Sequence, residues 1–175
     1  MNCDTSTLQK IIRDIPDFPK KGIIFKDITP ILKHPEAFRY AIDCIAEQIA
    51  PKKLDYIVGI ESRGFIFSPV LAYKLNAGFI PVRKKGKLPH KTEQIAYALE
   101  YGEAVLEIHR DALDAGARVA IVDDLLATGG TAAAAARLVE KLGGQVECFA
   151  FLVELEFLEG RKKLEGYDIF SLVKY

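Results

Sequence analysis

Two adjacent carboxylates stand at the end of an apolar run, directly before a glycine-rich loop. The stretch "VAIVDDLLATGGTAAAA" covers residues 119–135 and places Asp123 and Asp124 after four apolar residues. The paired glycines that follow permit close approach of the backbone, and a helix beginning near Thr131 would aim its free N–H groups and positive dipole end at the loop. These features predict a phosphate site whose ligand also carries groups that attract carboxylates.

A ribose 5-phosphate unit would satisfy both features. Its 2′- and 3′-hydroxyls suit Asp123 and Asp124, as a ribose hydroxyl suits the acidic residue of dinucleotide-binding folds, and the negative charge would stabilise a cationic ring carbon. The loop lacks the lysine of a Walker A motif and the spacing of G-x-G-x-x-G. A plain strand–turn–helix, or an acidic metal site, helix cap or solvated strand end, is the alternative. The residues predicted to hold the phosphate are Ala127, Thr128, Gly129, Gly130 and Thr131.

Two further loops are rich in groups that suit a diphosphate. "ESRG" brings Ser62, Arg63 and Gly64 to the start of a predicted helix, although a capped helix start with a solvated arginine explains it equally well. "RKKGKLP" begins at Arg83 and places four cations within five residues. Such a run is usually a solvated basic loop, but beside an anion site it would raise the local concentration of the anion.

The elements that must position these loops alternate along the chain. Continuous apolar strands that alternate with helices predict an α/β fold, with a central parallel sheet covered on both faces and ligands beyond the carboxyl ends of the strands. The predicted strands are residues 55–60, 78–83, 118–124, 146–154 and 169–175. The predicted helices are residues 5–14, 35–51, 65–75 and 131–142, and residues 23–30 form a short extended segment ended by Pro30.

The segment 84–108 interrupts this pattern with charged residues, glycine and proline and only weak strand alternation. A polar stretch of this length in a compact domain is usually a lid, which would protect a reactive intermediate from water. The whole chain of 175 residues predicts one domain, with a small N-terminal hood over residues 1–34 and a flexible lid over residues 84–108.

Composition narrows the classes of partner. Lys and Arg together number 24, as do Asp and Glu, so no overall charge favours nucleic acid or a membrane surface. No apolar run is long enough to span a bilayer. The first residues, "MNCDTSTLQK", have no basic stretch followed by an apolar one, as a signal peptide would, so we expect a cytoplasmic protein.

The stretch of acidic pair and "ATGGT" loop resembles the phosphoribosyl diphosphate (PRPP) motif of type I phosphoribosyltransferases. The blocks "PDFPKKGIIFKDITPIL", "GIESRGFIF", "RKKGKLP" and "LEYGEAVLEIHRDAL" resemble the adenine-specific members, in the same order and over nearly the whole chain. The resemblance implies a type I phosphoribosyltransferase fold and the reaction of adenine with PRPP to give AMP and pyrophosphate. It also implies Mg²⁺ bound through the diphosphate and a homodimer.

The resemblance also implies roles for residues at the diphosphate and the reacting nitrogen. Arg83 and Lys87, with Lys84 beside them, would contact the diphosphate. Glu100, followed by Tyr101 in the lid, would accept or relay the proton of the purine N9, although an exposed glutamate on a hairpin is the plainer interpretation. The peptide bond that precedes Ser62 would be cis.

At the base, the resemblance implies recognition by backbone. The Ile24 carbonyl would accept from the adenine N6 amino group, and the Lys26 amide would donate to N1. Phe25 would stack on one face of the ring and Leu155 on the other. The alternative is that Ile24 and Phe25 are core residues of a short strand.

Two other function classes are compatible with a PRPP loop. One is a transferase for orotate or a 6-oxopurine, against which the "IIFKD" segment argues. The other is a non-catalytic PRPP-sensing regulator, which normally carries a basic DNA-reading module. The stretch of about 54 residues before the first core strand has no clear helix-turn-helix and no basic excess, which favours an enzyme.

Overall fold

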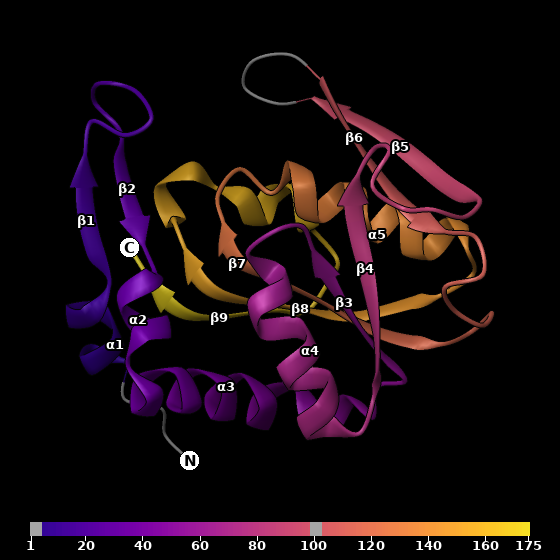
Figure 1. Cartoon of the computed structure of the whole chain (residues 1–175), viewed down its shortest axis with the longest axis horizontal. Helices are drawn as coiled ribbons and strands as arrows, with labels where there is room; N and C mark the ends of the chain where they lie inside the picture. Colours follow the sequence, from indigo (N-terminus) through magenta and orange to yellow (C-terminus); the bar gives the residue numbers. More distant parts are fainter. Residues whose placement is uncertain (1–4, 99–102) are drawn as a thin grey trace.

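The computed structural model describes residues 5–98 and 103–175, which form a seven-stranded sheet flanked by helices (Figure 1). The strand order is β5-β6-β4-β3-β7-β8-β9. The strands are β3 (Tyr56–Ile60), β4 (Gly78–Lys84), β5 (Thr92–Ala98), β6 (Glu103–His109), β7 (Arg118–Leu126), β8 (Gln145–Glu154) and β9 (Ile169–Lys174). Strands β4, β3, β7, β8 and β9 run parallel to one another, which confirms the predicted central parallel sheet.

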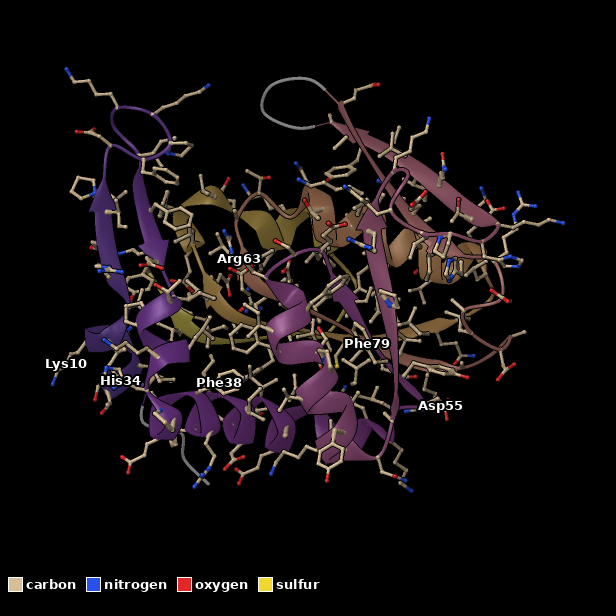
Figure 2. The ribbon with its side chains drawn as sticks, viewed as in Figure 1. Lys10, His34, Phe38, Asp55, Arg63 and Phe79 are labelled. Atoms are coloured by element: carbon tan, nitrogen blue, oxygen red, sulfur yellow. The ribbon has the colours of Figure 1, made fainter. Side chains whose placement is uncertain are left out.

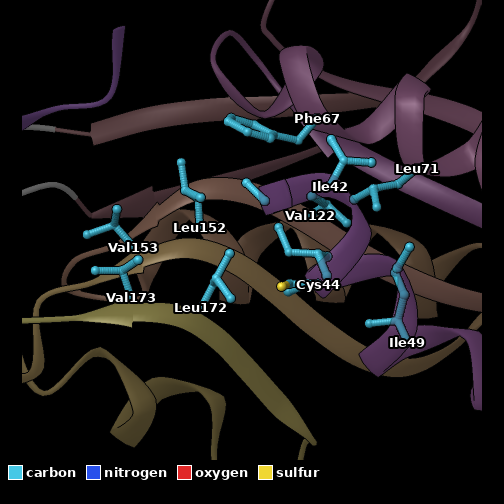
Figure 3. Close-up of a cluster of buried hydrophobic side chains, with 14 of the residues drawn as sticks. Ile42, Cys44, Ile49, Phe67, Leu71, Val122, Leu152, Val153, Leu172 and Val173 are labelled. Carbon is cyan, nitrogen blue, oxygen red and sulfur yellow. The ribbon is translucent and has the colours of Figure 1, made fainter. Parts of the chain in front are cut away.

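Helices cover both faces of this sheet. They are α1 (Ser6–Ile11), α2 (Thr29–Lys33), α3 (Pro35–Ile49), α4 (Gly64–Leu75) and α5 (Gly130–Lys141), with the short 3-10 helices η1 (Ala50–Lys52), η2 (Glu156–Leu158) and η3 (Gly160–Leu164). Alternate residues of a strand face opposite sides, so Ile57 packs in the core beneath α3 and α4, whereas Val58 packs in the core beneath α5. Figure 3 shows the first of these cores, where Ile42 and Leu71 meet the sheet.

A separate two-stranded sheet lies at one end of the molecule, beside the C-terminus (Figure 1). It pairs β1 (Arg13–Pro16) with β2 (Ile24–Asp27) in antiparallel register. The predicted helix 5–14 is therefore too long, because Arg13 leaves the helical pattern to pair with Asp27 across the strands. Pairing of this kind overrides weak helix propensity.

Pro30 does not end an extended segment as predicted. The strand β2 already ends at Asp27, whose carboxylate accepts the Thr29 N–H at 2.9 Å. This contact starts the short helix α2, in which Pro30 occupies the first turn, a position where its missing N–H costs nothing.

The segment 84–108 is more regular than its composition predicts. Strands β5 and β6 pair as an antiparallel hairpin from Thr92↔His109 to Ala98↔Glu103, and β6 continues onto β4 in antiparallel register. The hairpin therefore extends the main sheet at one edge, while movement as a lid stays a prediction. Within residues 5–98 and 103–175, no helix is both long and apolar enough to cross a membrane.

Candidate active site

A cavity of about 530 Å³ lies where the carboxyl ends of β3 and β7 meet the β5–β6 hairpin. It is lined by Glu61, Ser62, Arg63, Lys84, Tyr97, Ala104 and residues 123–132. The cavity brings together the predicted acidic pair, the whole loop 127–131, the "ESR" turn and one lysine of the basic run. Figure 2 shows Arg63 at the N-terminal end of α4, between the β1–β2 sheet and the hairpin in this view.

The acidic pair lies near the end of β7 and is joined to the "ESR" turn. Asp124 is only 5% exposed, and its Oδ2 accepts from Arg63 Nε. The Oδ1 oxygen of Asp123 accepts the Asp124 N–H at 2.9 Å. Burial raises the pKa of Asp123 well above its usual value, and the charge of Asp124 adds to this effect. Two carboxylates therefore face one cavity, where a diol could donate to both.

Gly64 fixes the approach of α4 to the acidic pair. A Cβ at this position would lie 2.9 Å from Asp123 Oδ1 and 2.9 Å from the Val122 carbonyl. Only glycine allows this close approach, so Gly64 acts by positioning Asp123. Gly64 itself does not line the cavity. The peptide bond between Glu61 and Ser62 is cis, which confirms the geometry implied by the family resemblance.

The loop 127–131 is in contact with Gly160, a glycine that was not predicted from the sequence to belong to the site. Gly129 has φ +77°, and a Cβ there would lie 2.3 Å from the Gly160 carbonyl. A Cβ on Gly160 would in turn lie 2.2 Å from the Ala127 carbonyl. The 3-10 helix η3 is thus pressed against the loop through two glycines that are distant in sequence, and no local motif around Gly160 indicates it. Tyr97 OH and Thr131 Oγ1, 3.3 Å apart, join the hairpin to the same loop.

Arg83 is engaged within the protein. Its Nε and Nη2 donate to the Glu61 carboxylate at 3.1 and 3.2 Å, and its Nη1 donates to the Lys87 carbonyl at 3.1 Å. The Arg83 hydrogen bond is the main cause that lowers the pKa of Glu61. Neither Arg83 nor Lys87 lines the cavity, whereas Lys84 does. Direct contact of Arg83 with a diphosphate stays a prediction, and this geometry favours an indirect role.

A buried glutamate that sequence analysis missed supports the basic loop. Glu107 is 2% exposed, and its Oε1 accepts the backbone N–H groups of Lys87 and Leu88 at 2.8 and 2.9 Å. Burial raises its pKa, but the hydrogen bonds from the loop backbone outweigh burial, so the pKa of Glu107 is lowered. Glu107 lies in the segment 84–108, whose polar and irregular composition gave no indication that this glutamate is buried.

The residues expected to hold a base lie outside the lined cavity but adjoin it through Arg63. The Arg63 guanidinium is 5.4 Å from the centre of the Phe25 ring, and Phe18 meets the same ring edge-on at 5.2 Å. Ile24 is 54% exposed, so it is not the core residue of the alternative interpretation. Leu155 is buried at 8% exposure.

The Lys26 side chain links the β1–β2 sheet to the C-terminal residue. Its Nζ pairs with Asp14 at 2.6 Å and lies 3.8 Å from the centre of the Tyr175 ring. Contact of the Lys26 backbone amide with a base stays a prediction. The predicted residues Glu100 and Tyr101 lie outside the described residues.

The donor set suits a metal that arrives with its substrate. Among the described residues, no group of three or more His, Cys, Asp or Glu side chains could hold a metal ion. The cavity does offer carboxylate oxygens from Asp123 and Asp124. Mg²⁺ prefers oxygen ligands and usually keeps several waters while binding substrate phosphates, so the residues present fit Mg²⁺ carried by a diphosphate.

Comparison with known proteins identifies the family. The family model described as "Phosphoribosyl transferase domain" matches residues 27–173. The chain belongs to this phosphoribosyltransferase family. An adenine phosphoribosyltransferase of a Thermoanaerobacter species is 60% identical over 168 residues, covering 96% of this chain and 97% of the relative. The Thermotoga maritima adenine phosphoribosyltransferase is 58% identical over 168 residues, with 96% and 97% covered.

Solved structures agree with the family. The adenine phosphoribosyltransferase of Thermoanaerobacter pseudethanolicus superposes with a TM-score of 0.94 at 58% identity, covering 97% of this chain and 98% of that one. The Saccharomyces cerevisiae enzyme, solved with adenine and an imino-altritol bisphosphate, gives a TM-score of 0.91 at 45% identity, covering 95% and 96%. The type I phosphoribosyltransferase fold predicted from the motifs is therefore confirmed.

Proposed function

We propose that this phosphoribosyltransferase transfers the 5-phosphoribosyl group of PRPP to adenine, giving AMP and pyrophosphate, the reaction of an adenine phosphoribosyltransferase in purine salvage. The observation that carries the proposal is the single cavity in which an acidic pair, a glycine loop at a helix N-terminus and a cationic turn converge. Those three features match the ribose diol, the 5′-phosphate and the diphosphate of PRPP respectively. The naming of close relatives supports adenine as the acceptor.

In this pentosyl transfer, the bond from C1′ to the diphosphate oxygen breaks and the bond from C1′ to N9 of adenine forms. The loop 127–131 holds the 5′-phosphate, and Asp123 and Asp124 accept from the ribose hydroxyls while their charge stabilises the cationic ribose ring. Ser62 and Arg63 hold the departing pyrophosphate, together with the ammonium groups of Lys84 and Lys87. Glu100 takes the proton from N9 as attack proceeds.

Base recognition falls to strand β2, whose first residue, Ile24, is exposed. Pro16 lies opposite Ile24 in the β1–β2 pairing and has no N–H, so it cannot take the Ile24 carbonyl. That carbonyl and the Lys26 amide would match the N6 donor and N1 acceptor of adenine. Hypoxanthine and guanine present the opposite pattern, which leaves both protein groups facing like partners.

The remaining parts of the proposal concern metal, assembly and location. Bound Mg²⁺ would neutralise and orient the diphosphate, and Asp123 and Asp124 would offer it protein oxygens. Residues 1–34 act as the hood over the base and residues 84–108 as the lid within one domain. The working form is a cytoplasmic homodimer.

The deciding experiment is to mix the protein with PRPP, Mg²⁺ and one base at a time, and to follow nucleotide formation by chromatography. AMP from adenine, with loss of activity on exhaustive chelation, is the expected result. Nucleotide formed only from orotate or from a 6-oxopurine would overturn the choice of acceptor. Pyrophosphate release without any base would mark a hydrolase instead.

A further inference from the structure

Two charged side chains bind the backbone of Lys87, one at its N–H group and the other at its carbonyl group. The Lys87 N–H donates to Glu107 Oε1 at 2.8 Å, and the Lys87 carbonyl accepts from Arg83 Nη1 at 3.1 Å. Arg83 and Glu107 lie directly opposite each other on β4 and β6. The basic loop between β4 and β5 is therefore anchored at one residue by a pair from the rigid sheet.

A charged residue is unfavourable at the buried position of Glu107 unless its carboxylate is hydrogen-bonded. Its strand neighbours Leu106 and Ile108 are both fully buried and apolar. A buried carboxylate is tolerated only when hydrogen bonds replace its water. Its Oε1 serves two loop amides, and its Oε2 accepts from Gln94 Nε2 at 3.2 Å. Its hydrogen bonds thus join the basic loop to β5.

The anchored residue carries a free cation. The Lys87 side chain is exposed, and no ion pair to it is found in residues 5–98 and 103–175. A lysine side chain loses much rotamer freedom when it binds an anion, so fixing its backbone beforehand lowers the total ordering cost. Gly86, at φ +81°, provides the sharp turn that brings the Lys87 amide to Glu107.

We infer that Glu107 is a positioning residue for the diphosphate of PRPP, which acts with Arg83 by fixing the Lys87 backbone from which the binding ammonium extends. The inference rests on the proposed function and deepens it. It gives Arg83 a structural role in place of direct contact. It also predicts that Glu107 affects PRPP and pyrophosphate but leaves adenine unaffected.

The kinetic test compares Glu107→Ala with Glu107→Gln. The alanine variant leaves two backbone donors without an acceptor, so the KM for PRPP should rise about tenfold or more while the KM for adenine stays within about twofold. The glutamine variant keeps an acceptor oxygen, so it should recover most of the PRPP affinity. Ile108→Val is the matched control, because it weakens the same strand by a buried methylene without touching the loop. Equal rises in KM for PRPP in the alanine variant and this control would overturn the inference.

A double-mutant cycle tests whether Glu107 acts through Lys87. If it does, Glu107→Ala should add less than about twofold to the KM for PRPP in a Lys87→Ala background. Full additivity of the two substitutions would show that they act independently and would overturn the inference.

Amide hydrogen exchange tests, independently of catalysis, whether Glu107 holds the backbone of the basic loop. In Glu107→Ala, the amides of Lys87 and Leu88 should exchange at least about tenfold faster than in the unsubstituted protein. Unchanged protection would overturn the inference even if AMP is formed. If no AMP is formed but exchange accelerates as expected, the proposed function fails while the anchor stands.

Discussion

Arg63 and Asp124 are joined by an ion pair that links the start of α4 to the end of β7. The two residues lie 61 positions apart. Asp124 is buried, whereas the arginine side chain is 44% exposed toward the cavity. The Arg63 guanidinium therefore contacts the carboxylate that we propose binds the ribose, and it lies 5.4 Å from the centre of the Phe25 ring. Its exposed part is open to a diphosphate. The base, ribose and diphosphate regions of the proposed site meet at Arg63.

The acidic pair should be essential to PRPP use while contributing little to the fold. Asp124→Asn and Asp123→Asn are nearly isosteric, but each removes charge that accepts from the ribose diol. Hydrogen bonds to charged groups are worth about 1.5–3 kcal/mol, so each variant should lose about 10- to 100-fold in kcat/KM for PRPP. Steady-state kinetics and thermal unfolding together test this. Wild-type kcat/KM in both variants would make the ribose assignment wrong.

Adenine binding should depend on the Phe25 ring. Stacking of a base on an aromatic ring contributes about 1–3 kcal/mol, so Phe25→Ala should raise the KM for adenine about tenfold. The KM for PRPP should change less, because Arg63 keeps its partner Asp124. An unchanged KM for adenine would place the base elsewhere.

Lys26→Ala provides the complementary test of backbone recognition. The side chain pairs with Asp14 and packs on Tyr175, so its loss should lower the melting temperature slightly and leave the preference for adenine intact. A site that reads hydrogen-bond pattern can reject the wrong base by about 10⁴–10⁵-fold. Competition between adenine and hypoxanthine measures this ratio. A Lys26→Ala enzyme that uses hypoxanthine within about tenfold of adenine would move recognition from the backbone to the side chain.

The sequence was sufficient for the parallel sheet and for the common location of the acidic pair and the loop 127–131, because both are encoded locally. Apolar runs mark the buried strands, and Asp123 to Thr131 form one continuous motif whose parts share a cavity. The early end of α1 was not predictable in this way. Arg13 belongs to a strand only because Asp27, 14 residues further along the chain, pairs with it.

The contacts that support the site could not be predicted from the sequence either, because their partners are also separated along the chain. Gly160 serves the loop that contains Gly129, and Glu107 serves Lys87, each across a long stretch of sequence. Nothing in the composition around these residues marks them. The family resemblance implied that Arg83 contacts the diphosphate, yet neither the resemblance nor the charge of the basic run reveals a prior partner such as Glu61.

Acid should destabilise the protein through its partnered carboxylates. The pKa values of Asp27, Glu61, Glu107 and Glu154 are all lowered in the folded state. Each group therefore contributes stability that is fully present above its unfolded pKa and is lost as pH falls through its folded pKa. The raised pKa of Asp123 acts in the opposite direction, but it belongs to a single group. The free energy of unfolding by denaturant should therefore decline below about pH 4.5, where the four lowered groups begin to bind protons in the unfolded state. A free energy of unfolding that rose as the pH fell below about 4.5 would contradict the lowered pKa values of these four carboxyl groups.

Glu100 is the proposed acceptor of the N9 proton. General acid–base help is commonly worth 10²–10⁴-fold, but adenine N9 is already a fair nucleophile and departure of pyrophosphate leads. We therefore expect Glu100→Gln to lower kcat by about 10²-fold or less, with little change in the KM for PRPP. Unchanged kcat and an unchanged pH profile would leave Glu100 as a structural residue.

The contact of Gly160 with the phosphate loop should be necessary for nucleotide binding. In Gly160→Ala, the new Cβ would stand 2.2 Å from the Ala127 carbonyl, so either the loop or η3 must move. Overpacking of this kind costs about 1–3 kcal/mol. For a chain of this size, that lowers the melting temperature by about 3–10 °C. The displaced loop should also bind the 5′-phosphate of AMP at least about tenfold more weakly.

Gly166→Ala separates the two effects. Gly166 has φ +92° and nothing within 4 Å of the new Cβ, so alanine there meets backbone strain without a clash. That strain is about 1–2 kcal/mol, which gives a loss of stability comparable to that of Gly160→Ala. Titration calorimetry with AMP should show wild-type affinity for Gly166→Ala and weakened affinity for Gly160→Ala. Equal AMP affinities in the two variants would mean that the Gly160 contact supports the fold alone and does not shape the phosphate loop.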